Sequence, residues 1–256
     1  MQEEIILGID IGGSGIKGAL VNIETGMLVS ERHRIPTPQP ATANKMAKTV
    51  KELVQHFNWE DKIGCGFPAI LKNGVARSAA NIDKSWIGVD AEALLSKATG
   101  CPVAILNDAD AAGLAEIQFG KGKNQKGVVI LITIGSGLGS ATFINGRLLP
   151  NSELGHIYLK GDDKVAELSC SNKAKKQEDL SWKDWAIRFN NYLQHIERMF
   201  SPNLIILGGG GSKKFEKFKS YLNLETTVVP AALLNNAGII GAAIHAKQFT
   251  LSGIKL

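Results

Sequence analysis

The chain has 256 residues, of which 44% are hydrophobic, and this is enough to build two modest domains or one large one with a real core. Its net charge of +5 favours anionic partners, but the excess is small for a nucleic-acid-binding protein. The cysteines Cys65, Cys101 and Cys170 lie far apart, which excludes a disulfide framework, a CxxC redox pair and a zinc knuckle, and is typical of a reducing, cytoplasmic compartment.

Neither a secretory signal nor a membrane span is expected. The start of the chain has two acidic residues before a short apolar run, where a signal peptide has a basic segment and a long apolar one. Apolar runs such as 128–134 are far shorter than the roughly 20 residues that a membrane-spanning helix needs.

The first half of the chain predicts an antiparallel meander, followed by alternating helices and strands. Strands are predicted over 5–11 and 16–23, and a third begins at Met27. The elements that follow are a helix over 41–57, a strand over 63–67, a helix over 91–97 and a strand over 103–106.

The second half also opens with a glycine-rich strand pair. After a helix over 108–118, strands over 127–134 and 139–144 are predicted, with a hairpin turn at Asn145–Gly146. The remaining elements are a helix over 181–200, a strand over 204–207, a lysine-rich helix over 213–221, a strand over 226–229 and a helix over 236–247. We therefore expect two related α/β domains facing one cleft, with a boundary near Leu106.

The helix over 181–200 carries an aromatic stripe at helical spacing, which indicates a buried core face or a dimer surface. Ser181 and Asp184 are placed to form a capping box at its start.

The segment 8–17 places an acid at the end of a buried strand, directly before a glycine turn. The bare amides of this turn can approach phosphate oxygens, and Asp10 would hold a Mg²⁺ that the phosphates share. The alternative is that Asp10 and the glycines only shape the turn. A formal GxGxxG is present here, but a strand follows it where a dinucleotide-binding fold needs a helix, and the GxxxxGK pattern of P-loop proteins is absent.

Two further polar motifs follow predicted strands. Asn107 and Asp108 lie where a buried strand meets a helix, a position suited to a carboxylate that accepts a hydroxyl proton and equally suited to a helix cap. Glu153 and His156 follow the second glycine hairpin and, with Asn81, could bind neighbouring hydroxyls of a sugar.

Together these motifs resemble the ROK sugar kinases in order and spacing, over nearly the whole chain. The shared strings are GIDIGGSGIK (8–17), ND (107–108), TIGSGLG (133–139), ELGH (153–156) and GGG (208–210). Within the family, the chain is most similar to the bacterial polyphosphate glucokinases, through GGSGIKG (12–18), NDADAAGLAE (107–116), LSW (180–182) and VPAAL (229–233).

The resemblance implies an actin-like (ribonuclease H-like) α/β fold of two domains around a central cleft, and phosphoryl transfer from polyphosphate, ATP or both to the 6-hydroxyl of glucose. The first implied domain covers 1–106 and is joined by a helix over about 237–256. The second covers 107–236. It also implies a homodimer. The implied site residues are Asp108 as catalytic base; Asn81, Asn107, Asp108, Glu153, His156 and Glu167 for the sugar; Gly12, Gly13, Ser14, Lys17, Gly135, Ser136, Gly137, Gly209 and Gly210 for phosphate; and Asp10 for Mg²⁺.

One departure from the family concerns zinc. Many ROK proteins follow the Glu-x-Gly-His motif with a cysteine-rich zinc site, whereas only Cys170 lies near it here, so no structural zinc is expected. The polyphosphate glucokinases share this departure. ROK repressors carry a DNA-binding domain before the kinase fold, and a first strand that starts at Ile5 leaves no room for one.

Three questions stay open at this point: whether the enzyme is a strictly ATP-dependent glucokinase or mannokinase, whether the chain is a non-catalytic sugar sensor, and whether its lysines form a track for polyphosphate. The presence of Asp108 argues against a sensor. The lysines fit a positive track or a merely solvated face equally well; they are Lys121, Lys123, Lys126, Lys173, Lys175, Lys176, Lys213, Lys214, Lys217 and Lys219.

Overall fold

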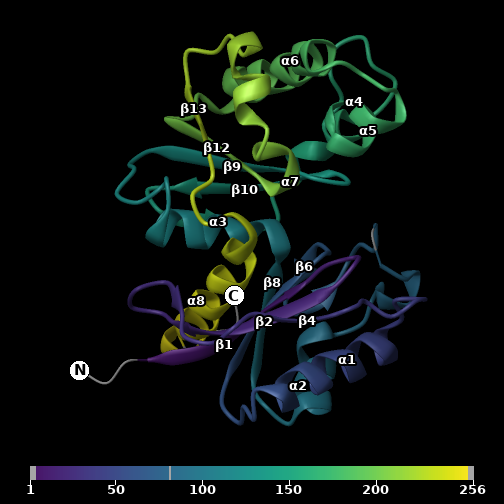
Figure 1. Cartoon of the computed structure of the whole chain (residues 1–256), viewed down its shortest axis with the longest axis vertical. Coiled ribbons are helices and arrows are strands. Elements are labelled where there is room, and N and C mark those ends of the chain that lie inside the picture. The colour runs from purple at the N-terminus through teal and green to yellow at the C-terminus, as the bar shows by residue number, and fades with distance from the viewer. Residues whose placement is uncertain (1–3, 81, 253–256) are drawn as a thin grey trace. The chain divides into compact units, whose positions relative to one another are not determined.

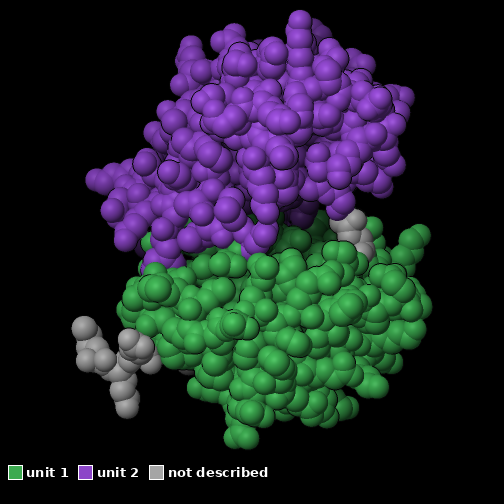
Figure 2. Space-filling model, in the orientation of Figure 1, with its two compact units in different colours: residues 1–118, 236–256 green, residues 119–235 purple. Residues whose placement is uncertain are grey.

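The computed structural model describes residues 4–80 and 82–252 of the chain, which form a mixed α/β fold (Figure 1). The chain divides into two compact units, coloured separately in Figure 2: unit 1 comprises residues 1–118 and 236–256, and unit 2 comprises residues 119–235. No helix of the described residues is both long and apolar enough to cross a bilayer.

The sheet of unit 1 combines an antiparallel meander with two parallel strands. Its order is β3-β2-β1-β5-β8, and β4 also pairs with β2. Its strands are β1 (Ile5–Ile11), β2 (Ile16–Asn22), β3 (Met27–Leu28), β4 (His33–Ile35), β5 (Ile63–Phe67) and β8 (Val103–Asn107). The third strand, predicted to begin at Met27, is thus split into β3 and β4, which pair with opposite ends of β2.

The remaining elements of unit 1 cover this sheet and connect its strands. They are α1 (Ala43–His56), the two-stranded sheet of β6 (Leu71–Lys72) and β7 (Val75–Ala76), the 3₁₀ turn η1 (Lys84–Trp86), α2 (Ala91–Thr99), α3 (Asp108–Phe119) and α8 (Ala237–Ser252). Every residue of β5 is buried, as expected for a central strand of a parallel sheet.

The sheet of unit 2 has the same design as that of unit 1. Its order, β11-β10-β9-β12-β13, again places three antiparallel strands beside two parallel ones. The strands are β9 (Val128–Ile134), β10 (Leu138–Ile144), β11 (Arg147–Leu149), β12 (Leu204–Gly208) and β13 (Thr227–Pro230). The predicted turn at Asn145–Gly146 joins β10 to β11 and is confirmed: both residues have positive φ, at 51° and 78°, as a two-residue hairpin turn requires.

The helices of unit 2 lie mainly between β11 and β12. They are η2 (Leu154–His156), α4 (Ala166–Cys170), α5 (Asn172–Gln177) and α6 (Trp182–Phe200). Ser181 caps α6 by accepting a hydrogen bond from the backbone N–H of Asp184 at 3.1 Å, as predicted. The aromatic side chains of Trp185, Phe189 and Tyr192 are buried in the core of unit 2, which confirms the interpretation of this stripe as a core face.

The prediction of a helix over 213–221 was wrong. The glycine turn leads into the short α7 (Gly209–Ser212), and the 3₁₀ turns η3 (Phe215–Lys217) and η4 (Lys219–Tyr221) follow. Lys213 and Lys217 would be like-charged neighbours four residues apart on an α-helix, which destabilises it. The 3₁₀ geometry places Phe215 and Phe218 on one side, and their ring centroids are 5.5 Å apart.

Helix α8 packs so tightly in unit 1 that it needs glycine at several contacts. A Cβ on Gly8 of β1 or Gly64 of β5 would overlap the backbone of α8, and a Cβ on Gly241 of α8 would overlap the carbonyl group of Ala111 in α3. Helix α3 therefore packs within unit 1 through Ala111. The unit consequently extends to residue 118, past the boundary predicted near Leu106.

We expect Gly241→Ala to destabilise the protein by about 1–3 kcal/mol, because the added methyl group would overpack a backbone contact. Thermal unfolding followed by circular dichroism checks this. Gly210→Ala is the matched control, since a Cβ at Gly210 meets nothing within 4 Å. Equal melting temperatures for the two variants would contradict the packing argument.

Candidate active site

In unit 1, Asp10 lies near the end of β1 and faces Lys17 across the β1–β2 ladder. The Lys17 Nζ is 3.3 Å from the Asp10 Oδ2, and both side chains are partly exposed, at 29% and 20%. The turn between these strands closes with a hydrogen bond from the Gly12 N–H to the Gly15 carbonyl at 3.1 Å. The structure thus brings Asp10 and Lys17 together, and the exposed Gly13 and Ser14 lie in the adjoining turn.

The segment around β4 braces this turn, a feature that the sequence analysis missed. Arg34 donates a hydrogen bond from Nη2 to the Ser14 carbonyl at 2.6 Å, and Thr37 donates one from Oγ1 to the Gly12 carbonyl at 2.5 Å. A Cβ on Gly15 would lie 2.5 Å from the Arg34 Nε, so glycine at this position leaves room for the guanidinium. Arg34 could have been found by predicting that β4 pairs with β2 beside the turn. The sequence analysis predicted a single third strand from Met27 and therefore did not identify β4 as a separate strand.

The donor set at the turn fits magnesium. Among the described residues, no three His, Cys, Asp or Glu side chains gather as a metal site. Mg²⁺ does not need such a cluster, because it is commonly held by one or two carboxylates, water and the phosphates of a substrate. Asp10 supplies one carboxylate, and Gly238 at the start of α8 leaves it space, since a Cβ there would be 3.1 Å from the Asp10 Cγ.

Asn107 and Asp108 lie at the junction of β8 and α3, also in unit 1. The Asn107 Oδ1 accepts hydrogen bonds from the backbone N–H groups of Ala109 and Asp110 at 2.8 and 3.2 Å, and its Nδ2 donates to the Ala69 carbonyl at 3.2 Å. Asn107 is therefore the helix cap and is buried. Asp108 is partly exposed, and its Oδ1 accepts from the Ala109 N–H at 2.8 Å.

This arrangement assigns the capping of α3 to Asn107. Because Asn107 satisfies the first amides of α3, capping does not require Asp108. A carboxylate that begins a firmly capped helix is held in a fixed place, as a catalytic base must be. The predicted sugar ligand Asn81 lies outside the described residues.

In unit 2, the loop Gly135–Ser136–Gly137 joins β9 to β10. It closes with a hydrogen bond from the Gly135 N–H to the Gly137 carbonyl at 2.9 Å, and Ser136 is exposed. Glu167 braces the loop from α4: its Oε2 accepts from the Leu138 N–H at 2.9 Å, and a side chain on Gly137 would overlap it. Glu167, predicted to bind sugar, thus uses one carboxylate oxygen to hold the loop that is predicted to bind phosphate.

The second glycine cluster of unit 2 lies beside this loop. A Cβ on Gly209 would come within 2.7 Å of the Ile134 carbonyl oxygen, and one on Gly211 would come within 2.5 Å of the Ile134 side chain. Gly210 is exposed and faces open space. Since Ile134 immediately precedes Gly135, the two predicted phosphate-binding segments of unit 2 are neighbours in space.

Glu153 immediately precedes η2 and His156 is the last residue of η2, which lies close to β10. The His156 Nδ1 is 3.4 Å from the Glu153 Oε2, and their side chains are 49% and 25% exposed, respectively. Leu154 donates its backbone N–H to the Ser140 Oγ at 2.8 Å, which ties this turn to β10. The structure therefore brings Glu153 and His156 together as the sequence predicted.

The electrostatics of Glu153 are those of a partly buried acid beside a second acid. Burial raises its pKa, the nearby Glu167 carboxylate raises it further, and His156 opposes both effects. Glu153 therefore keeps its proton to a higher pH than an ordinary glutamate. A partly buried acid next to an imidazole is suited to hydrogen bonding with hydroxyl groups.

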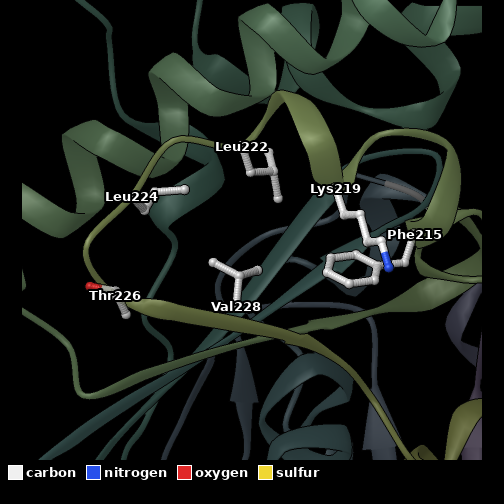
Figure 3. Close-up of a pocket in the computed structure, with 6 residues that line it drawn as sticks. All are labelled: Phe215, Lys219, Leu222, Leu224, Thr226 and Val228. Carbon is white, nitrogen blue, oxygen red and sulfur yellow. The ribbon is translucent and has the colours of Figure 1, made fainter.

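A separate pocket of about 300 Å³ lies in unit 2 (Figure 3). It is lined by Phe215, Lys219, Leu222, Leu224, Thr226 and Val228. None of the predicted sugar, phosphate or metal residues that the structure describes lines it. We therefore identify the candidate site from its polar side chains and glycine loops and not from this pocket.

The ten lysines proposed as a track all belong to unit 2. Lys175 and Lys219 make contacts within the protein. Lys175 donates to the Leu180 carbonyl at 2.5 Å and lies over the Trp182 ring, with its Nζ 4.6 Å from the ring centroid. Lys219 pairs with Glu216 at 2.7 Å.

Comparisons with known proteins point to one family. The model of the ROK family matches residues 6–175. A polyphosphate glucokinase of Mycobacterium tuberculosis (strain CDC 1551 / Oshkosh) is 48% identical over 238 residues, which cover 93% of this chain and 89% of that protein.

Solved structures show the same similarity. The inorganic polyphosphate/ATP-glucomannokinase of Arthrobacter sp. strain KM has a TM-score of 0.91 and 45% identity, covering 95% of this chain and 98% of that one. A ROK family glucokinase of Streptomyces griseus, solved with glucose and AMPPNP, shares the fold, with a TM-score of 0.82 and 24% identity over 96% of this chain and 100% of that one.

Proposed function

The chain belongs to the ROK family, and we propose that it is a sugar kinase that uses inorganic polyphosphate to phosphorylate glucose at its 6-hydroxyl. The observation that carries the proposal is the 48% identity to a polyphosphate glucokinase over 93% of the chain. The product is glucose 6-phosphate, and a polyphosphate shortened by one phosphate is released.

Asp108 is the catalytic base of this reaction. Its carboxylate accepts the proton of the 6-hydroxyl while the hydroxyl oxygen bonds to the terminal phosphorus, and the bond from that phosphorus to its bridging oxygen breaks. Asn107 caps α3 and so positions Asp108. One N–H of the Asn107 amide is bonded to Ala69, and the other donates to a sugar hydroxyl.

Other polar side chains bind the sugar. Glu153 and His156 accept and donate hydrogen bonds to neighbouring hydroxyls, and their mutual contact sets their orientation. Asn81 and the second carboxylate oxygen of Glu167 complete the set of sugar ligands.

The glycine loops bind the phosphoryl donor through backbone N–H groups, which lie close to phosphate oxygens because glycine has no side chain. These loops consist of Gly12, Gly13 and Ser14 in unit 1 and Gly135, Ser136, Gly137, Gly209 and Gly210 in unit 2. Lys17 adds a positive charge, and Asp10 would hold Mg²⁺. When bound, Mg²⁺ neutralises phosphate charge in the donor.

We also propose ATP as a second phosphoryl donor and mannose as a second sugar acceptor, because of a similar enzyme of known structure. The Arthrobacter enzyme, 45% identical, is named for polyphosphate, ATP, glucose and mannose. We also propose that the two units are the two domains of an actin-like fold and that the protein is a homodimer. Sedimentation analysis measures the oligomeric state.

A matrix of donors and sugars tests the function. We expect glucose 6-phosphate to form from glucose with nucleotide-free polyphosphate, and turnover of mannose with either donor would extend the acceptor range. Turnover with ATP alone would indicate an ATP-dependent glucokinase instead. Glucose binding without turnover on any donor would indicate a sugar sensor.

A further inference from the structure

Two basic side chains face each other beside the glycine turn of unit 1. Lys17 of β2 is directly opposite Arg34 of β4, and Asp10 of β1 is directly opposite Lys17. Residues that are directly opposite in an antiparallel pair project from the same face of the sheet. Asp10, Lys17 and Arg34 therefore form a row across three strands, next to the turn at residues 12–15.

Arg34 is fixed within this row. Its Nη2 donates to the Ser14 carbonyl at 2.6 Å, and Gly15 leaves the space that its guanidinium occupies. Arg34 is nevertheless an exposed residue. A guanidinium has five N–H donors, so the bond to Ser14 leaves others for a ligand.

The row carries more positive than negative charge. Like charges directly opposite each other on neighbouring strands are destabilising. Asp10 pairs with Lys17 at 3.3 Å, and the net charge of the three side chains is positive. An anion beside Lys17 and Arg34 would relieve this repulsion, and a guanidinium is particularly suited to phosphate because its N–H groups match two phosphate oxygens at once.

We propose that Arg34 is a donor-binding residue that, together with Lys17, holds neighbouring phosphate groups of polyphosphate at the glycine turn. This inference rests on the proposed function and specifies part of its donor site. A chain of phosphates presents a negative charge at every repeat, so it can engage both cations while its terminal phosphate reacts. The alternative is that Arg34 only braces the turn through Ser14.

Kinetics of Arg34→Gln separate these roles. We expect the KM for polyphosphate to rise about tenfold, the usual scale for one lost hydrogen bond to a charged group, with a much smaller change in kcat. The slope of log KM against log salt concentration should become shallower, because one fewer cation contacts the polyanion. The KM for glucose and the melting temperature should stay close to those of the wild type.

Lys51→Gln is the matched control, because it removes one positive charge from an exposed position on α1 of the same unit. It should change neither KM nor the salt slope. If both variants raise the KM for polyphosphate equally, the effect is one of net charge and the inference is wrong. If Arg34→Gln lowers kcat and the melting temperature while the salt slope is unchanged, Arg34 only braces the turn.

Gly15→Ala provides an independent test, because its methyl group would displace the Arg34 guanidinium. We expect this variant to weaken polyphosphate binding in the wild-type background and to have little further effect in Arg34→Gln. Such coupling is what a double-mutant cycle measures. Additive effects would show that Gly15 acts independently of Arg34.

Direct binding of end-labelled polyphosphate, measured by fluorescence anisotropy without turnover, separates this inference from the proposed function. Binding by the wild type and equal binding by Arg34→Gln would overturn the role of Arg34 alone. Failure of the wild type to bind polyphosphate would overturn both.

Discussion

Replacing Asp108 with asparagine is expected to lower kcat by about 10²- to 10⁴-fold, because the amide cannot accept the proton of the sugar hydroxyl. The fold and glucose binding should be retained, since the substitution is isosteric and Asn107 caps α3. Initial rates of glucose 6-phosphate formation, with glucose affinity measured by calorimetry, check this prediction.

The choice of asparagine makes the experiment decisive between the two roles considered for Asp108. Asparagine caps helices about as well as aspartate does, so a residue that only caps would tolerate the change. Asn107→Ala is the comparison, because it removes the observed cap and should cost about 0.5–2 kcal/mol of stability. Near-normal turnover in Asp108→Asn with glucose bound would exclude Asp108 as the base.

Replacing Asp10 with asparagine is the second change with a large expected effect. We expect a loss of at least about 10²-fold in kcat/KM and a weaker response to Mg²⁺, because the phosphates would lose the carboxylate that fixes their counter-ion. A titration of activity with Mg²⁺ in chelator-treated protein measures both quantities.

Glu52→Gln controls for the lost negative charge, because Glu52 is exposed on α1 in the same unit. This control should keep the rate and the Mg²⁺ dependence of the wild type. If Asp10→Asn also kept both, Asp10 would serve only to pair with Lys17 and shape the turn.

Much of the fold follows from local patterns in the sequence. The bounds of β1 and β5 agree with the prediction, because short apolar runs between turn residues have few alternatives. The hairpin turn at Asn145–Gly146 was also predictable, since these residue types favour the positive φ that it needs. The contact between Glu153 and His156 was predictable from their spacing on one short turn.

Contacts between distant segments were not predictable. Nothing near Gly8, Gly64 or Gly241 in the sequence indicates that α8 packs there backbone to backbone. The same limit explains why Arg34 was missed, because its contact with Ser14 spans 20 residues and depends on the short β4. It also explains Glu167, whose bond to Leu138 joins α4 to the start of β10, 29 residues earlier in the chain.

Phosphorylation of glucose by polyphosphate can be followed by ³¹P NMR of the purified protein with glucose, Mg²⁺ and nucleotide-free polyphosphate. We expect a growing glucose 6-phosphate resonance, matched by loss of polyphosphate signal and nearly absent in Asp108→Asn. No sugar phosphate from polyphosphate of any length, with glucose 6-phosphate formed from ATP under the same conditions, would contradict it.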